Sequence, residues 1–142
     1  MAEAYMVAGA MDLKLELIAV PVSDVDRAKA FYAEQVGFNV DNDVTVRDGL
    51  RFVQLTPPGS ACSISIGEGI TEVEPGTLEG LQLVAHDIEV ARKELSARGL
   101  EASEIQDFPW GRFVFFSDPD GNGWAVQQIP DYGEGRTQPE GL

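Results

Sequence analysis

Strand-like and helix-like patterns of apolar residues follow each other twice along the chain, in the same order. The β-rich runs 17–22 and 80–85 lead to an aspartate, Asp24 or Asp87, and apolar residues at helical spacing come next. The two segments match at a constant offset of 63 residues. The pattern therefore predicts an internal repeat in which each copy begins with a strand, a turn and a helix.

The two aspartates stand where each predicted helix begins. A short carboxylate at this position accepts hydrogen bonds from the free N–H groups of the first turn, so we expect Asp24 and Asp87 to be N-caps. Ser23 and Asp26 approximate a capping box at the first helix. These roles are structural rather than chemical.

Short strands are predicted after each helix, which we expect to end at Gly37 and Gly99. They are 38–40, 44–46, 51–55 and 62–66 in the first copy and 101–105, 112–116 and 124–128 in the second. With 38–40 and 44–46 taken together as the counterpart of 101–105, each copy is β-α-β-β-β, and one such copy is too small to bury a sufficient core alone. We predict an α+β fold in which two tandem βαβββ modules, about 13–66 and 78–129, form a curved mixed sheet around a cleft.

The remaining segments carry few apolar residues. Residues 1–12 are expected to be an N-terminal extension to the domain, which spans 13–129, and residues 67–77 to connect the modules. Residues 130–142, rich in glycine and polar residues, are predicted to form a mobile C-terminal tail.

Composition and charge narrow the class of protein. The chain has 142 residues, 44% apolar and 24% charged, which fits one globular domain or two small half-domains folded as a unit. Its formal charge of −14 disfavours nucleic acid and anionic lipid as partners. No apolar run reaches the roughly 18 residues of a membrane helix, and residues 1–11 lack the features of a signal peptide, so we expect a cytoplasmic protein.

The single cysteine and the single histidine limit the available chemistry. Cys62 alone cannot form an internal disulfide or a Cys-rich zinc site, and we interpret it as a small apolar residue rather than a nucleophile. His86 adjoins the Asp87 cap and is expected at the surface or in the cap, with contact to a ligand or partner chain as the alternative.

Four stretches of sequence resemble a known group of proteins. They are 22–32 (Val-Ser-Asp-Val-Asp-Arg-Ala-Lys-Ala-Phe-Tyr), 35–38 (Gln-Val-Gly-Phe), 109–112 (Pro-Trp-Gly-Arg) and 115–124 (Phe-Phe-Ser-Asp-Pro-Asp-Gly-Asn-Gly-Trp). With the internal repeat, they resemble the vicinal oxygen chelate superfamily, which includes glyoxalase I, bleomycin resistance proteins and extradiol dioxygenases. The resemblance implies the fold but not the function, because this fold hosts enzymes and drug-binding proteins alike.

The resemblance also implies where a metal would be held. The corresponding positions, in the first and last strands of each module, carry Leu17, Ser63, Gly80 and Ala125. None of these is a credible ligand for a divalent ion, which needs several donor atoms converging at about 2 to 2.5 Å. We therefore expect a variant with no metal and no cofactor.

Alternation along the strands predicts the wall of the cleft. If Leu17 and Ala125 face inward, so do small and neutral residues, among them Ala19, Ser63, Ser65, Gly80, Gln82, Val84, Gly123 and Gln127. Aromatic residues concentrate between 108 and 124, and the adjacent Phe115 and Phe116 must face opposite sides. The ligand contacts we predict are Leu17, Ala19, Ser63, Gln82, Trp110, Phe115, Trp124, Ala125 and Gln127.

Two functions fit this wall. The first is metal-independent binding of a hydrophobic or aromatic small molecule by a homodimer, as in a resistance or carrier protein. The alternative is a metal-free isomerase, cyclase or lyase, with a metal-dependent glyoxalase or dioxygenase a weaker third. Binding is favoured because the titratable candidates fall mostly in loops or at strand ends: Asp43, Arg47, Arg51, Glu68, His86, Asp107 and Arg112.

Overall fold

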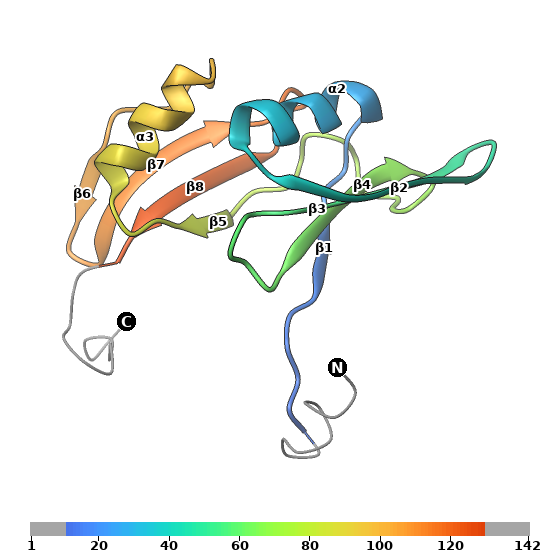
Figure 1. The fold of residues 1–142 in the computed structure, drawn as a ribbon, viewed down its shortest axis with the longest axis horizontal. Helices are drawn as coiled ribbons and strands as arrows, with labels where there is room; N and C mark the ends of the chain where they lie inside the picture. The colour runs from blue at the N-terminus through green and yellow to red at the C-terminus, as the bar shows by residue number, and fades with distance from the viewer. Residues whose placement is uncertain (1–10, 130–142) are drawn as a thin grey trace.

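The computed structural model describes residues 11–129 (Figure 1). The first module contains β1 (Leu17–Ala19), α2 (Val25–Ala30), the π-helix η1 (Phe31–Val36), β2 (Asn39–Arg47), β3 (Leu50–Thr56) and β4 (Ser63–Glu68). The second contains β5 (Leu81–Val84), α3 (Ile88–Ala97), β6 (Gln106–Phe108), β7 (Gly111–Ser117) and β8 (Gly123–Gln128). The predicted α+β fold with tandem βαβββ modules is confirmed. The predicted C-terminal tail and most of the N-terminal extension lie outside the described residues.

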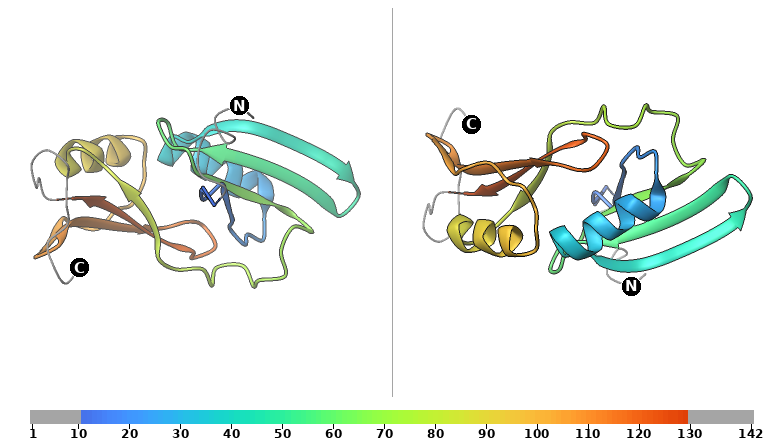
Figure 2. Two further views of the ribbon diagram at one scale, coloured as in Figure 1. Left: turned by 90° about the horizontal axis from the view of Figure 1, so that it is seen from below. Right: turned by 90° about the horizontal axis from the view of Figure 1, so that it is seen from above.

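Each module forms its own four-stranded mixed sheet. The strand orders are β1-β4-β3-β2 and β5-β8-β7-β6, so the repeat in the sequence is also a repeat in topology. The first strand of each module runs parallel to the last, and the other pairs are antiparallel. The sheets lie side by side with the helices on one common side (Figures 1 and 2). We call the two sheet faces turned away from the helices the open faces.

Within residues 11–129, one hydrophobic core lies between the sheets and the helices and crosses from one module to the other. Tyr32 and Phe38 of the first module contact Trp124 of the second, with ring centroids 5.7 and 5.8 Å from it. Phe116 stacks on Trp124 at 5.9 Å and 4°. Aromatic pairs in such geometries add about 0.5–1.5 kcal/mol beyond the burial of their area. The modules are therefore fused through their aromatic residues.

The predicted helix starts are confirmed. The Asp24 carboxylate accepts a hydrogen bond from the Arg27 amide, and the Asp87 carboxylate accepts from the amides of Glu89 and Val90. The predicted capping box is wrong, because the Ser23 hydroxyl donates to Asp120 of the other module. A long-range partner here replaces the local one.

The first helix differs from a regular α-helix in its second half. The Gly37 amide donates to the carbonyl of Tyr32, five residues earlier, which is the spacing of a π-helix. The wider turn places the adjacent Phe31 and Tyr32 in the core, 8% and 0% exposed. Gly37 and Gly99 follow the helices with φ of +92° each, as their predicted roles require.

Two strand predictions need correction. The separate strands 38–40 and 44–46 are one strand, β2, which continues through two irregularities in its pairing with β3. The strand predicted at 101–105 is absent, and β6 begins at Gln106 instead. Ser103 pairs with β7 differently: its amide donates to the carbonyl of Phe115, and its hydroxyl accepts from the Phe115 amide. The side chain of Ser103 thus takes the place of a backbone ladder partner.

Candidate ligand-binding site

The strand register decides which predicted wall residues share a face. Leu17 pairs with Ser63 on the first sheet, and Gln82 pairs with Ala125 on the second. Because side chains alternate along a strand, these four lie on the open faces, whereas their neighbours such as Ile64 point toward the helices. Ala19, Ser65, Val84 and Gln127 follow by the same alternation.

A row of four aromatic rings lies on the open face of the second sheet; we call Phe108, Trp110, Phe113 and Phe115 the aromatic row. Phe108 stacks on Trp110, with centroids 5.3 Å apart, and meets Phe113 edge to face at 5.6 Å. Phe113 stacks on Phe115 at 5.9 Å and 5°. Phe113 is buried, but Phe108, Trp110 and Phe115 are 38%, 44% and 38% exposed. Exposed rings held in parallel pairs offer a flat apolar surface.

Two glutamines hold the aromatic row in place. The Gln82 side chain donates to the Gln127 side-chain oxygen at 2.6 Å, and the Gln127 amide group donates to the carbonyl of Trp110 at 3.2 Å. Gly111 makes this approach possible, since a Cβ there would lie 2.8 Å from the Gln127 amide nitrogen. The turn that carries Trp110 is thereby tied to β8.

The open face of the first sheet is polar at its centre. Gln54 donates from its amide to the Ser63 hydroxyl at 3.2 Å, and the Ser63 and Thr56 hydroxyls share a hydrogen bond at 2.6 Å. Thr56 donates to the carboxylate of Asp41. Asp41 is a site residue that sequence reasoning missed, because it lies at an irregularity in the β2–β3 pairing that no local pattern marks.

Trp124, predicted to contact ligand, lies in the core. Its side chain is on the face of β8 opposite Ala125, is 5% exposed, and donates from Nε1 to the Tyr32 hydroxyl at 2.9 Å. Trp124 also borders a cavity of about 150 Å³ between the modules, together with Cys62 and Ser63. Cys62 is a free, half-buried thiol.

Most titratable candidates lie away from the open faces. On the first module, Arg51 and Lys29 bind the carboxylate of Asp43 on the helix side at 2.8 and 2.7 Å. Their hydrogen bonds, Arg51 first, hold the pKa of Asp43 well below its usual range. His86 is exposed in the turn before α3.

The second module shows the same arrangement. Arg112 reaches Asp107 and the α3 residue Glu89 at 2.8 and 3.2 Å, also on the helix side. Hydrogen bonds to Asp107 and then to Glu89 raise the pKa of Arg112. These groups bind each other on the helix side. Among the described residues, the open face of the second sheet therefore places no strong acid or base beside the aromatic row.

The family's metal positions do not fit a metal ion. Leu17, Ser63, Gly80 and Ala125 contribute one hydroxyl oxygen between them, and that hydroxyl is engaged by Gln54 and Thr56. Within residues 11–129, no three His, Cys, Asp or Glu side chains gather in a way that could hold a metal. We therefore derive no chemistry through a metal.

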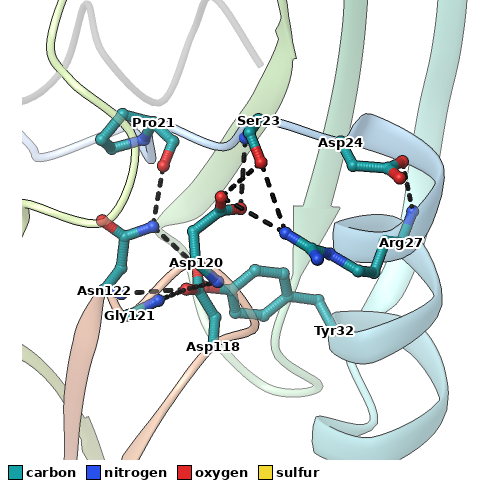
Figure 3. A network of polar contacts seen from close by, with 9 residues as sticks. All are labelled: Pro21, Ser23, Asp24, Arg27, Tyr32, Asp118, Asp120, Gly121 and Asn122. Carbon is teal, nitrogen blue, oxygen red and sulfur yellow. Dashed lines mark hydrogen bonds and ion pairs between the residues drawn. The ribbon is translucent and has the colours of Figure 1, made fainter.

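The Asp-Pro-Asp-Gly-Asn stretch, which the sequence analysis used only as part of the family resemblance, joins the modules (Figure 3). One oxygen of the buried Asp118 accepts from the backbone amides of Asp120, Gly121 and Asn122. Its other oxygen accepts from the Tyr32 hydroxyl at 2.7 Å and from the Asn122 side chain at 2.8 Å. Burial, and then the Asp118 charge, raise the pKa of Tyr32 well above its usual range.

Three further hydrogen bonds and an ion pair fasten the same junction. The Asn122 amide group also donates to the carbonyl of Pro21 at 2.8 Å, and Asp120 accepts from the hydroxyl and the amide of Ser23. Arg27 lies 3.4 Å from the Asp120 carboxylate (Figure 3). Residues of the stretches 22–32 and 115–124, which carry part of the family resemblance, thus hold the two modules together on the side away from the aromatic row.

Comparison with known proteins identifies the family. The sequence profile of the glyoxalase/bleomycin resistance protein/dioxygenase superfamily matches residues 14–126. The chain belongs to this superfamily. The expected family membership is therefore confirmed.

Two solved structures are similar to this chain in both sequence and shape, and one further relative is similar in sequence. TnmS3, described as an antibiotic binding protein from Streptomyces sp. CB03234, is 34% identical with a TM-score of 0.77, over 86% of this chain and 100% of its own. A glyoxalase/bleomycin resistance protein from the same organism is 36% identical with a TM-score of 0.72, over 81% and 100%. The uncharacterized protein YwkD of Bacillus subtilis (strain 168) is 32% identical over 112 residues, 72% of this chain and 87% of its own.

None of the helices within residues 11–129 is long and apolar enough to span a membrane.

Proposed function

We propose that this protein binds a hydrophobic or aromatic small molecule on its open faces, without a metal ion. The aromatic row carries the proposal, because its three exposed rings, each stacked in parallel on a neighbouring ring, offer contact area that water solvates poorly. Trp110 and Phe115 are the proposed main contacts, with Gln82 and Gln127 orienting the ligand. Leu17, Ala19, Ser63 and Ala125 complete the wall. The similarity to a protein described as antibiotic binding supports this class of function.

The partner we propose is a second copy of the chain. Both open faces point to the same side, so neither sheet covers the other within one chain (Figures 1 and 2). Exposed apolar residues on them include Val44, Val84 and Phe115, at 49%, 67% and 38%. A two-fold partner facing this side would set the first sheet of one copy against the second sheet of the other, enclosing two equivalent clefts.

A metal-free isomerase, cyclase or lyase is the second candidate function. The observation that favours it is the hydrogen-bond chain from Gln54 through Ser63 and Thr56 to Asp41, which brings a carboxylate to the edge of the first open face. A bound ligand recovered chemically unchanged after prolonged incubation supports binding alone. Conversion that Asp41→Asn abolishes would establish the enzyme.

Tryptophan fluorescence tests the binding proposal. The chain has two tryptophans, so in the Trp124→Phe variant all tryptophan emission comes from Trp110. Titration with a panel of flat polycyclic aromatic compounds should quench or shift that emission in a saturable way, and equilibrium dialysis should give the same dissociation constant. If no compound in the panel saturates either measurement, binding of flat aromatic molecules is the wrong function.

A further inference from the structure

A groove of about 840 Å³ lies on the helix side of the molecule, between the two modules. One wall is formed by α2 and η1 of the first module, and the other by the loop that follows α3 and by the end of β7. Its volume is within the range of small-molecule sites, about 300–1,000 Å³. The groove lies on the face of β7 opposite Phe115 and the aromatic row, so it is separate from the open faces.

The floor of the groove is apolar. It is lined by Phe31 at the start of η1, Leu100 in the loop after α3, and Phe116 of β7, which are 8%, 5% and 5% exposed. The Phe31 and Phe116 rings belong to different modules, and their centroids lie 6.2 Å apart with the planes tilted by 47°. A molecule resting on this floor gains apolar contact with both modules at once.

The π-helix η1 brings polar side chains to the same groove. Such helices are rare and frequently mark functional sites. Glu34 and Gln35 of η1 both border the groove. Gln35 is half-buried, and within residues 11–129 its side chain makes no hydrogen bond. Its amide group is therefore available to a ligand.

Carboxylates dominate the charge of the groove. Glu34 and Glu101 are exposed at it from opposite walls, and within residues 11–129 neither carboxylate forms an ion pair or a hydrogen bond. The buried Asp118 carboxylate accepts hydrogen bonds from neutral donors alone. Arg27 also borders the groove, but its guanidinium is directed toward the Asp120 carboxylate, 3.4 Å away (Figure 3). The groove is therefore complementary to a positively charged ligand.

We propose that this groove binds organic cations with an apolar body, such as aromatic amines. The apolar body rests on Phe31 and Phe116, and the cationic group lies at the carboxylates of Glu34 and Glu101, where it keeps part of its water. Because each module supplies one wall, a bound cation also stabilises the junction between the modules and raises the melting temperature. This site depends neither on ligand binding at the open faces nor on a second copy of the chain.

An NMR titration of the isotope-labelled protein locates the binding. The probes are naphthylmethylammonium, its uncharged counterpart naphthylmethanol and the naphthoate anion. The ammonium ion should shift the backbone amides of Gly99, Leu100 and Glu101 in a saturable way. At these amides the alcohol should bind at least about threefold more weakly, and added salt should reduce the difference. Absence of saturable shifts, or equal dissociation constants for the ammonium ion, the alcohol and the anion, would overturn the proposal.

Removal of the two groove carboxylates tests their role. The double variant Glu34→Gln and Glu101→Gln should weaken binding of the ammonium ion at Gly99 by about threefold or more and leave that of the alcohol nearly unchanged. The matched control is Glu94→Gln with Glu104→Gln, which changes the net charge equally at exposed positions outside the groove. It should bind both probes like the wild type. Equal losses in the two double variants would show that overall charge attracts the cation, and they would refute the proposal.

Filling the groove is a second test. Ala30 is exposed on its wall, so Ala30→Phe should abolish the shifts at Gly99 for both the ammonium ion and the alcohol. Ala97→Phe, at an exposed position of α3 outside the groove, is the control and should leave the shifts unchanged. Circular dichroism checks that both variants fold. Binding of the ammonium ion that survives Ala30→Phe places the cation elsewhere and contradicts the proposal.

The outcomes also separate this inference from the proposed function. Shifts at Gly99 that persist in Trp110→Ala, in a protein that binds no flat aromatic compound at the aromatic row, support the groove and refute the proposed function. Aromatic compounds that bind at Trp110, with no probe shifting Gly99, support the proposed function and refute the groove.

Discussion

The hydroxyl of Tyr32 and the carboxylate of Asp118, 86 residues apart in the sequence, are joined by a buried hydrogen bond of 2.7 Å. The same hydroxyl accepts a hydrogen bond from Trp124. One tyrosine oxygen of the first module thus satisfies two buried polar groups of the second. This contact lies in the aromatic core between the modules, so it fixes their relative orientation.

Replacing Tyr32 should therefore destabilise the whole chain. Tyr32→Phe keeps the ring but leaves the Trp124 N–H without its acceptor and removes one donor to Asp118. We expect a loss of about 1–3 kcal/mol in the free energy of unfolding, measured by urea denaturation. The exposed Ser96→Ala on α3 is the control and should change that free energy by less than about 0.5 kcal/mol. Equal stability of the two variants would mean that this hydrogen bond does not couple the modules.

Gly111 should matter for ligand binding more than for folding. In Gly111→Ala the new Cβ would displace the Gln127 amide group, which holds the turn of Trp110. Loss of one such hydrogen bond, about 1 kcal/mol, should weaken affinity for an aromatic ligand about fivefold in equilibrium dialysis. Gly59→Ala is the control. Its φ is also positive, +83°, so an alanine strains the backbone there too, but nothing lies within 4 Å of the added methyl group. The prediction is wrong if Gly59→Ala weakens binding as much as Gly111→Ala.

Local features of the fold were predictable from sequence, whereas contacts between the modules were not. Asp24 and Asp87 act on amides two or three residues away, so their role follows from the neighbouring pattern. Asp118 meets Tyr32 only because the two modules fold against each other. The same holds for Ser23. Its hydroxyl donates to Asp120 of the other module and not to Asp26, the partner that the neighbouring sequence suggests.

The candidate site follows the same division. Strand alternation correctly separated Phe115 from Phe116, which are 38% and 5% exposed. It also implies that Trp124 opposes Ala125, and the structure places the Trp124 ring in the core. Asp41 was not predictable, because the irregularity in β2 that brings it to Thr56 breaks the alternation on which the prediction rests.

The Asp43 carboxylate should make stability depend on pH in the acid range. Its pKa is lowered in the folded state, so the unfolded chain binds the proton more readily. The stabilisation is then fully present above the ordinary aspartate pKa of about 3.9 and is lost as the pH falls below it. Urea denaturation should be repeated at decreasing pH from 7 into the acid range. The free energy of unfolding should fall less over this range for Asp43→Asn than for the wild type. If the free energy of unfolding depends on pH in the same way in both proteins, Asp43 does not contribute to the loss of stability in acid.

Metal removal should leave the protein unchanged. Leu17, Ser63, Gly80 and Ala125 cannot supply the donor atoms of a divalent site, so no binding free energy of a metal should add to stability. We expect the same melting temperature with and without a chelator, and elemental analysis of chelator-free preparations should find no stoichiometric transition metal. If the preparations contain about one divalent ion per chain and chelation lowers the melting temperature, the protein is a metal-dependent member of its superfamily.

Affinity for an aromatic ligand should depend on the aromatic row rather than on charge. Trp110→Ala and Phe115→Ala each remove an exposed ring from the proposed contact surface, so each should weaken binding by about 1–3 kcal/mol, a factor of about 5 to 150. Trp124→Phe keeps an aromatic ring in the core and loses one hydrogen bond, so we expect lower stability with nearly unchanged affinity. His86→Ala and Arg112→Ala alter groups on the turn and the helix side and should bind like the wild type.

Isothermal titration calorimetry on folded variants, checked by circular dichroism, measures these differences. Affinity lost with His86→Ala or Arg112→Ala but kept with Trp110→Ala and Phe115→Ala would place the ligand on the polar helix side instead. The result matters for the chemistry as well, because the ion pairs of Arg112 with Asp107 and Glu89 would then have to open to admit the ligand. Salt screens these exposed ion pairs and lowers the cost of opening them, so binding of an uncharged ligand there should strengthen as salt rises, whereas binding at the aromatic row should be insensitive to salt.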